Sequence, residues 1–88
     1  MFYVYLLHSA KDGGLYIGLT ENLQRRIEEH KRGSVTSTRN RLPIKLIHYE
    51  SFLRKQDAEA REKYLKSGYG RQQLKDSLKT LFKQLNIN

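Results

Sequence analysis

Two charged side chains of this sequence lie where a helix would normally carry apolar residues. Arg26 follows Leu23 by three residues and precedes Ile27, so it lies along the edge of a predicted apolar stripe. Glu62 follows Ala58 by four residues, on the face of a later helix that should turn toward the core. Because an isolated charge is costly to bury, each side chain needs a charged partner or a solvated cleft. An arginine that binds phosphate oxygens and a carboxylate that binds Mg²⁺ would together suit a phosphodiester substrate.

Phosphodiester hydrolysis needs an activated water, positive charge near the phosphorus, and help for the leaving oxygen. Arg26 can hold a phosphate oxygen bidentately. Glu62 can be the single carboxylate of a Mg²⁺ or Mn²⁺ site, since waters and substrate phosphate can complete the octahedron. The competing interpretation of Glu62 is a surface ion pair with Lys66, four residues on, worth about 0.3–0.5 kcal/mol.

Two tyrosine-bearing segments, Tyr3-Val4-Tyr5 and Tyr16-Ile17-Gly18, precede these charged residues, and Arg26 follows Gly18 by eight residues. With Glu62 in its later helix, this constellation resembles the GIY-YIG nuclease family over roughly residues 2 to 70. The first segment departs from the family motif, which usually has glycine and isoleucine before the tyrosine. The chain is similar in particular to the N-terminal nuclease domain of the excision-repair nuclease subunit.

The resemblance implies catalytic roles for Tyr5, Tyr16, Arg26, His30 and Glu62. Tyr16 would activate or position the attacking water, and Tyr5 would lie beside it and position water or phosphate. An ordinary phenol, with a pKa of about 10, is a poor base at neutral pH, so neighbouring positive charge would have to lower that pKa. His30 would orient Arg26, contact phosphate or act as an auxiliary base. The alternatives are a core aromatic for Tyr5 and a half-buried helix-edge histidine for His30.

The resemblance implies a nucleic-acid substrate, with DNA expected before RNA, and the charge composition is compatible with it. The chain has 17 Lys and Arg against 9 Asp and Glu, a net charge of +8, which favours association with polyanions. The residues expected to bind substrate are a glycine that allows close backbone approach and a set of basic residues: Gly18, Arg25, Lys31, Arg32, Arg39 and Arg41.

The sequence pattern predicts an α+β fold, a single domain over residues 1–88 in which helices flank a three-stranded antiparallel sheet. Strands are expected over 2–8, 15–19 and 44–52, and helices over 21–31, 55–66 and 71–85. Thr20 is the expected N-cap of the first helix and Gly68 the stop of the second. Residues 31–41 are expected to form a mobile loop. In the third strand, alternation places Ile44, Leu46 and His48 on one face and Lys45, Ile47 and Tyr49 on the other.

The chain has no cysteine and no apolar run near the roughly 20 residues that a membrane span needs. We therefore expect a cytoplasmic protein without a membrane partner. With no separate targeting domain visible, it would recruit a protein partner, read DNA structure through its basic loop, or act without sequence preference.

Two other functions compete with the metal-dependent endonuclease. One is a non-catalytic nucleic-acid-binding module, and the other is an adaptor in a DNA-repair complex. The family commonly has an asparagine downstream of the glutamate, and neither Asn86 nor Asn88 aligns with it. Both a monomer and a dimer remain compatible with the sequence.

Overall fold

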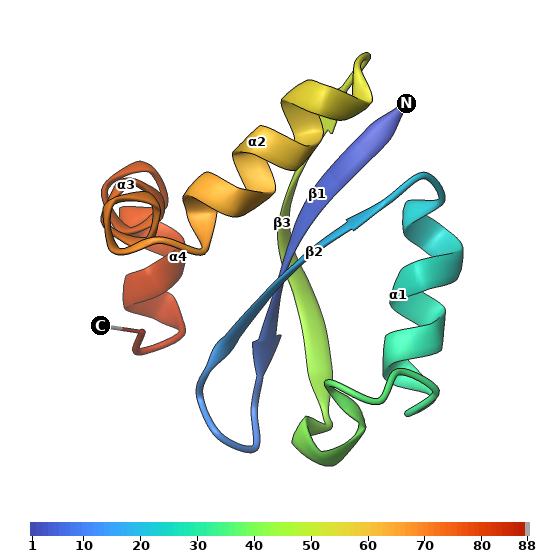
Figure 1. Ribbon diagram of the computed structural model, residues 1–88. Coiled ribbons are helices and arrows are strands. Elements are labelled where there is room, and N and C mark those ends of the chain that lie inside the picture. Colours follow the sequence, from blue (N-terminus) through green and yellow to red (C-terminus); the bar gives the residue numbers. More distant parts are fainter. Residues whose placement is uncertain (88) are drawn as a thin grey trace.

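The computed structural model describes residues 1–87 and has a three-stranded antiparallel sheet at its centre (Figure 1). The strands are β1 (Phe2–Ser9), β2 (Leu15–Thr20) and β3 (Ile44–Phe52), in the order β2-β1-β3. β1 and β2 form a hairpin whose turn includes Gly13 at φ 72°, a conformation that glycine adopts without steric cost. The predicted sheet is confirmed.

Helices cover both faces of the sheet. The helix α1 (Leu23–Lys31) lies on one face, while α2 (Lys55–Leu65), α3 (Gly68–Ser77) and α4 (Lys79–Gln84) lie on the other (Figure 1). A short 3₁₀ turn, η1 (Arg39–Arg41), leads into β3. Among residues 1–87, none of the helices has the length and apolar character that crossing a membrane requires.

The alternation of side chains along β1 divides the core into two clusters. Val4 and Leu6 point toward the α2–α4 side, where they pack with buried residues such as Leu74. Tyr5 and Leu7 point toward α1. Because a strand turns successive side chains to opposite faces, β1 supplies apolar packing to one side and a tyrosine hydroxyl to the other.

A β-bulge in β3 makes the faces of this strand differ from the predicted alternation. Leu6 pairs with His48 and Leu7 pairs with Leu46, so Ile47 is an extra residue that has no partner on β1. Ile47 packs into the α2–α4 cluster as expected. Beyond the bulge the alternation shifts, and His48 lies on the α2 side rather than with Leu46.

The helix ends also differ from prediction. Asn22, not Thr20, caps α1, since its side chain accepts a hydrogen bond from the Arg25 amide at 3.1 Å. Gly68 does not end a helix. It begins α3 after Ser67, whose hydroxyl accepts from the Gly70 amide.

The predicted final helix is two helices, because Leu78 leaves helical geometry at φ −116° and ψ 38°. The α2–α3 corner is tight, and a Cβ on Gly70 would overlap the backbone of Tyr64. The segment 31–41, expected to be a mobile loop, contains the last residue of α1, the turn η1 and two buried side chains, Val35 and Thr38. Thr38 reaches the candidate site.

Candidate active site

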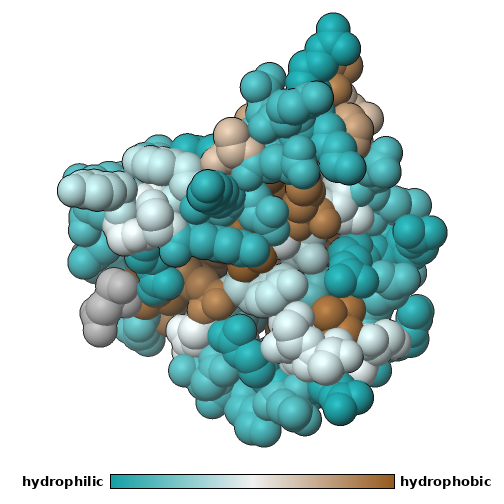
Figure 2. Space-filling model, viewed as in Figure 1, coloured by the Kyte–Doolittle hydropathy of each residue, from teal (hydrophilic) through white to brown (hydrophobic). Residues whose placement is uncertain are grey.

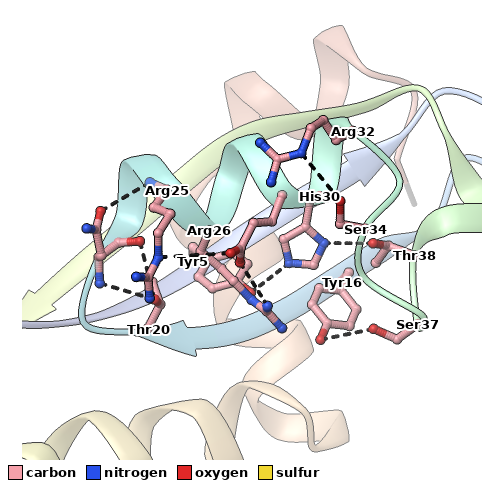
Figure 3. Close-up of polar contacts among 12 residues, drawn as sticks. Tyr5, Tyr16, Thr20, Arg25, Arg26, His30, Arg32, Ser34, Ser37 and Thr38 are labelled. Carbon is pink, nitrogen blue, oxygen red and sulfur yellow. Dashed lines mark hydrogen bonds and ion pairs between the residues drawn. The ribbon is translucent and has the colours of Figure 1, made fainter.

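A chain of three hydrogen-bonded side chains is buried between the sheet and α1. The Tyr5 hydroxyl lies 2.8 Å from His30 Nε2, and His30 Nδ1 lies 2.7 Å from Thr38 Oγ1 (Figure 3). Tyr5 is 2% exposed, and both His30 and Thr38 are 0% exposed. Since buried polar groups are costly without partners, this chain satisfies both ring nitrogens of His30 inside an otherwise apolar cluster.

Arg26 lies beside the Tyr5 hydroxyl. Its position favours one direction for the hydrogen bonds that join Tyr5, His30 and Thr38. The Tyr5 hydroxyl, and then the Glu29 carboxylate 3.1 Å from Arg26 Nη1, raise the pKa of Arg26. Arginine is only a donor, so the Tyr5 oxygen beside Arg26 is placed to accept from it, which favours the tautomer in which the Tyr5 hydroxyl donates to His30 Nε2. In that tautomer His30 Nδ1–H donates to Thr38 Oγ1.

The two buried groups resist ionisation. Burial lowers the pKa of His30, and the positive charge of Arg26 lowers it further. Burial raises the pKa of Tyr5, although Arg26 acts in the opposite direction. A neutral imidazole and a neutral phenol are therefore the resting forms.

Tyr16 stands at the open side of this cluster. Its ring centroid lies 5.2 Å from that of His30 and 6.4 Å from that of Tyr5. Its hydroxyl accepts a hydrogen bond from Ser37 Oγ at 3.3 Å (Figure 3). Unlike Tyr5, Tyr16 is only partly buried, so its hydroxyl can meet solvent.

Gly18 makes room for Tyr5. The two residues are paired across β1 and β2, and a Cβ on Gly18 would overlap the Tyr5 hydroxyl. Gly18 is expected to allow a close approach to the backbone, and in the structure the group that comes close is the Tyr5 side chain. Whether it also approaches substrate stays a prediction.

Glu62 comes from α2, on the other face of the sheet. Burial is the main cause of the raised Tyr5 pKa, and the Glu62 charge, the smallest of the causes, raises it further. Its side chain is 23% exposed and pairs with Lys66 Nζ at 3.2 Å. Within residues 1–87, no three His, Asp or Glu side chains group as a multidentate metal site. A single partly exposed carboxylate fits a Mg²⁺ or Mn²⁺ ion that takes its other ligands from water and phosphate.

Comparison with known proteins identifies the family of this chain. The model of the GIY-YIG catalytic domain matches residues 1–75. The chain belongs to the GIY-YIG nuclease family. It is 46% identical over 67 residues to a UPF0213 protein of Clostridium perfringens, covering 75% of this chain and 71% of the relative.

Other UPF0213 proteins give similar matches. One from Natronomonas pharaonis is 46% identical over 66 residues, covering 74% of this chain and 76% of the relative. The solution NMR structure of a UPF0213 protein from Bacillus halodurans is 37% identical, with a TM-score of 0.53. That match covers 84% of this chain and 82% of the other. The GIY-YIG fold predicted from the sequence is therefore confirmed.

The basic residues predicted to bind substrate differ in whether a carboxylate of the chain already pairs with them. Arg41 is held by Asp12, with Nε 2.7 Å from Oδ2, and this pairing lowers the pKa of Asp12. Arg25 Nε lies 3.9 Å from Glu29. Lys31, Arg32 and Arg39 are exposed, and no carboxylate of residues 1–87 pairs with them. Arg41 thus has a structural role at the hairpin turn of this GIY-YIG domain.

Sequence reasoning missed the polar support of the GIY-YIG site. Thr38 and Ser37 lie in the segment predicted to be mobile, and each contacts a motif side chain. The run Val-Thr-Ser-Thr carried only a weak signal, one apolar residue among hydroxyls. Of the two downstream asparagines, Asn86 lines a hollow among lysines of α3 and α4, and Asn88 lies outside the described residues.

Proposed function

We propose that this protein is a metal-dependent endonuclease that hydrolyses phosphodiester bonds in DNA, with RNA as the second substrate to be tested. The observation that carries the proposal is the meeting of Tyr5, Tyr16 and Arg26 around His30, and Glu62 of α2 is the carboxylate proposed to complete the site. These residues come from β1, β2, α1 and α2, so only the folded chain assembles them.

Exposure divides the work between the two tyrosines. Tyr16 is the one whose hydroxyl can meet an attacking water, and Ser37 Oγ donates a hydrogen bond to this hydroxyl at 3.3 Å. The water oxygen forms the new bond to phosphorus and gives up its proton to solvent, and the bond to the leaving sugar oxygen breaks as that oxygen takes up a proton from solvent. Tyr5 is buried, so it acts through its bond to His30 and its place beside Arg26.

Arg26 is suited to stabilise the charge that develops on the phosphate. Its side chain is 38% exposed, enough to meet a substrate oxygen while Glu29 keeps it oriented. Preformed positive charge of this kind contributes most in a partly water-excluded site. A Mg²⁺ or Mn²⁺ ion on Glu62 would supply further positive charge to the phosphate oxygens.

In the structure, the positive charge next to the Glu62 carboxylate is the Lys66 ammonium group. The same ion pair favours a second candidate function, a nucleic-acid-binding module without cleavage, because it neutralises the carboxylate without any metal. Lys66 is paired with Oε2 of Glu62, so a metal could be bound through Oε1, or through both oxygens once the Lys66 ammonium moves away. The pair is partly exposed and so costs little to break.

The test is cleavage of branched, flap and plain DNA, and of RNA, with Mg²⁺ or Mn²⁺. Glu62→Gln and Arg26→Ala should each lower the rate by about 10²-fold or more, the loss typical of removing a transition-state stabiliser. Tyr16→Phe should also reduce cleavage strongly. Matched controls are Glu59→Gln on the exposed side of α2 and Tyr69→Phe, whose side chain is 85% exposed. Cleavage that survives in all three site variants would eliminate the proposal, and binding without cleavage in every protein would favour the binding module.

A further inference from the structure

Three lysines of the C-terminal helices surround one hollow of about 500 Å³. Lys75 lies in the last turn of α3, and Lys79 and Lys83 lie one turn apart on α4. All three are exposed, while Phe82 and Ile87 beneath them are buried. Their ammonium groups therefore border an apolar floor that belongs to the core, and their own position is not fixed by packing.

These lysines carry charge that the described part of the chain does not neutralise. In residues 1–87 no carboxylate lies within 4.0 Å of their ammonium groups. The nearest acidic residue in sequence, Asp76, instead accepts a hydrogen bond from Gln72 at 3.0 Å. Like charges one turn apart on a helix repel one another, so a bound polyanion would relieve an unfavourable interaction.

A second groove has one lining residue in the candidate active site, Tyr16, and another, Arg71, that contacts the floor of this hollow. The groove, of about 390 Å³, is lined by Tyr16 of β2, by Lys66 after α2 and by Arg71 of α3. The Arg71 guanidinium in turn lies over the Phe82 ring, 6.0 Å from its centroid, and Phe82 is a floor residue of the lysine hollow. Figure 2 shows apolar surface between the α3–α4 side and the strands, with hydrophilic surface around it.

We propose that Lys75, Lys79 and Lys83 bind the sugar-phosphate backbone of a nucleic acid outside the active site, and that Arg71 and Lys66 lead the strand from there to Tyr16. The proposal rests on the nucleic-acid substrate of the proposed function. Lysine ammonium groups on flexible stems act as point charges, so this surface positions the backbone and reads no base sequence. Lys79 and Lys83 lie beyond residue 75, where the match to the GIY-YIG model ends.

The decisive comparison uses two triple variants with the same change in net charge. One is Lys75→Gln, Lys79→Gln and Lys83→Gln. The control is Lys45→Gln, Lys55→Gln and Lys63→Gln, three exposed lysines of β3 and α2 for which no side-chain hydrogen bond or ion pair is found in residues 1–87. Thermal unfolding of both triples checks that the exposed changes leave the fold intact.

Binding to a duplex and to a single strand is measured by fluorescence anisotropy in EDTA, so that cleavage does not intervene. Three lost phosphate contacts should weaken duplex binding by about tenfold or more at 0.1 M salt and make the slope of log K against log salt shallower by about 2.7. The control triple should retain most of the wild-type slope. Equal losses in the two triples would overturn the proposal, as would lysine-dependent binding to anionic phosphatidylserine vesicles without lysine-dependent binding to nucleic acid.

The same set of proteins separates this proposal from the endonuclease. If the wild type cleaves no substrate with Mg²⁺ or Mn²⁺ but the α3–α4 triple still loses affinity, the lysine surface stands and the endonuclease falls. If Glu62→Gln abolishes cleavage while the α3–α4 triple binds like the control, the endonuclease stands and the lysine surface falls. A wild-type protein with no measurable affinity for nucleic acid would overturn both.

Discussion

The hydroxyl of Tyr5 and Nε2 of His30 lie 2.8 Å apart in the interior, 25 residues apart in the chain. This contact ties the central strand to α1, and it continues through the other ring nitrogen to Thr38. A buried polar chain is favourable only when every member is satisfied, because an unpaired group in a low dielectric is costly. Each of these side chains therefore bears on stability as well as on the site.

Thr38→Val should break the end of this chain with almost no change in volume. His30 Nδ1 would keep its burial and lose its partner, so the free energy of unfolding should fall by about 1–3 kcal/mol. Thr38→Ser keeps the hydroxyl and should restore most of that stability. Urea unfolding measures the loss, and ¹⁵N NMR of His30 reports the tautomer.

The tautomer readout distinguishes positioning from simple packing. In the wild type and in Thr38→Ser, Nδ1 of His30 should carry the proton and Nε2 should accept from Tyr5. Thr38→Val should show a mixed or reversed tautomer and reduced cleavage. An unchanged His30 spectrum in Thr38→Val would show that Thr38 does not set the tautomer.

Stability should depend on pH through His30. Burial and the nearby Arg26 place the folded pKa of His30 below its ordinary value of 6.5, and Glu29 opposes them. Below about pH 6.5 the unfolded chain therefore binds more protons than the folded chain, so the free energy of unfolding falls as pH decreases. The loss continues down to the folded pKa of His30 and is complete below it.

Urea unfolding between about pH 5 and 8 measures this slope, since histidine is the side chain that ordinarily titrates there. His30→Gln removes the titration while keeping a polar side chain, so its slope should be smaller than that of the wild type. Identical slopes in the two proteins would exclude His30 as the source.

Gly18→Ala should damage the site more than its small size suggests. The added Cβ would overlap the Tyr5 hydroxyl, so Tyr5 or β2 must move. Overpacking of this kind costs about 1–3 kcal/mol. The control is Gly68→Ala, where no atom lies within 4 Å of the new Cβ and where alanine favours the helix. The unfolding temperature and the cleavage rate should both fall in Gly18→Ala, and both should stay unchanged in Gly68→Ala. Equal behaviour of the two variants would contradict the close approach of Gly18 to Tyr5.

The fold was predictable because its signals are local. Aromatic and aliphatic residues mark β1, the Lys-Asp-Gly-Gly turn marks the hairpin, and the spacing of Leu23 and Ile27 marks α1. The juxtaposition of Tyr5, Tyr16 and Arg26 followed from a motif match. Their hydrogen-bond partners did not, because Thr38 reaches His30 only through the tertiary path of residues 32–41.

Two of the wrong details, the cap of α1 and the role of Gly68, come from competition between equally good local signals. Thr20 and Asn22 are both good N-cap residues, but Thr20 is still paired with Tyr3 at the end of β2, so Asn22 caps α1. Gly68 is as suitable after a helix as at the start of one, and Ser67 supplies the cap that decides. The bulge at Ile47 leaves no mark in the sequence, since Ile47 fits either face of a strand.

Arg61 should position Glu62 by holding α2 against β3. Its Nε and Nη2 lie 2.8 Å and 3.1 Å from the two Glu50 oxygens, and Nη2 also donates to Gln73 Oε1 at 2.9 Å. His48 Nε2 lies 2.9 Å from the same carboxylate. Arg61→Ala should therefore lower the free energy of unfolding by about 1–2 kcal/mol, a value reduced for partial exposure. Cleavage should fall with it, because the turn of α2 that carries Glu62 loses its tie to the sheet.

The dependence of the free energy of unfolding on pH, at acid pH, provides a second measurement for Arg61→Ala. Burial raises the pKa of Glu50, but hydrogen bonds from Arg61 and His48 outweigh it and leave the pKa below its usual value of 4.5. The folded chain thus binds fewer protons than the unfolded chain near that pH, so this stabilisation is present above pH 4.5 and is lost as pH falls through the folded pKa. In Arg61→Ala the free energy of unfolding should fall less steeply below pH 4.5 than in the wild type. The control is Lys63→Ala, two residues further along α2 and exposed, which should leave stability, its dependence on acid pH and cleavage unchanged. Full cleavage by Arg61→Ala would show that Glu62 is held in place by the core residues Ala58 and Leu65 alone.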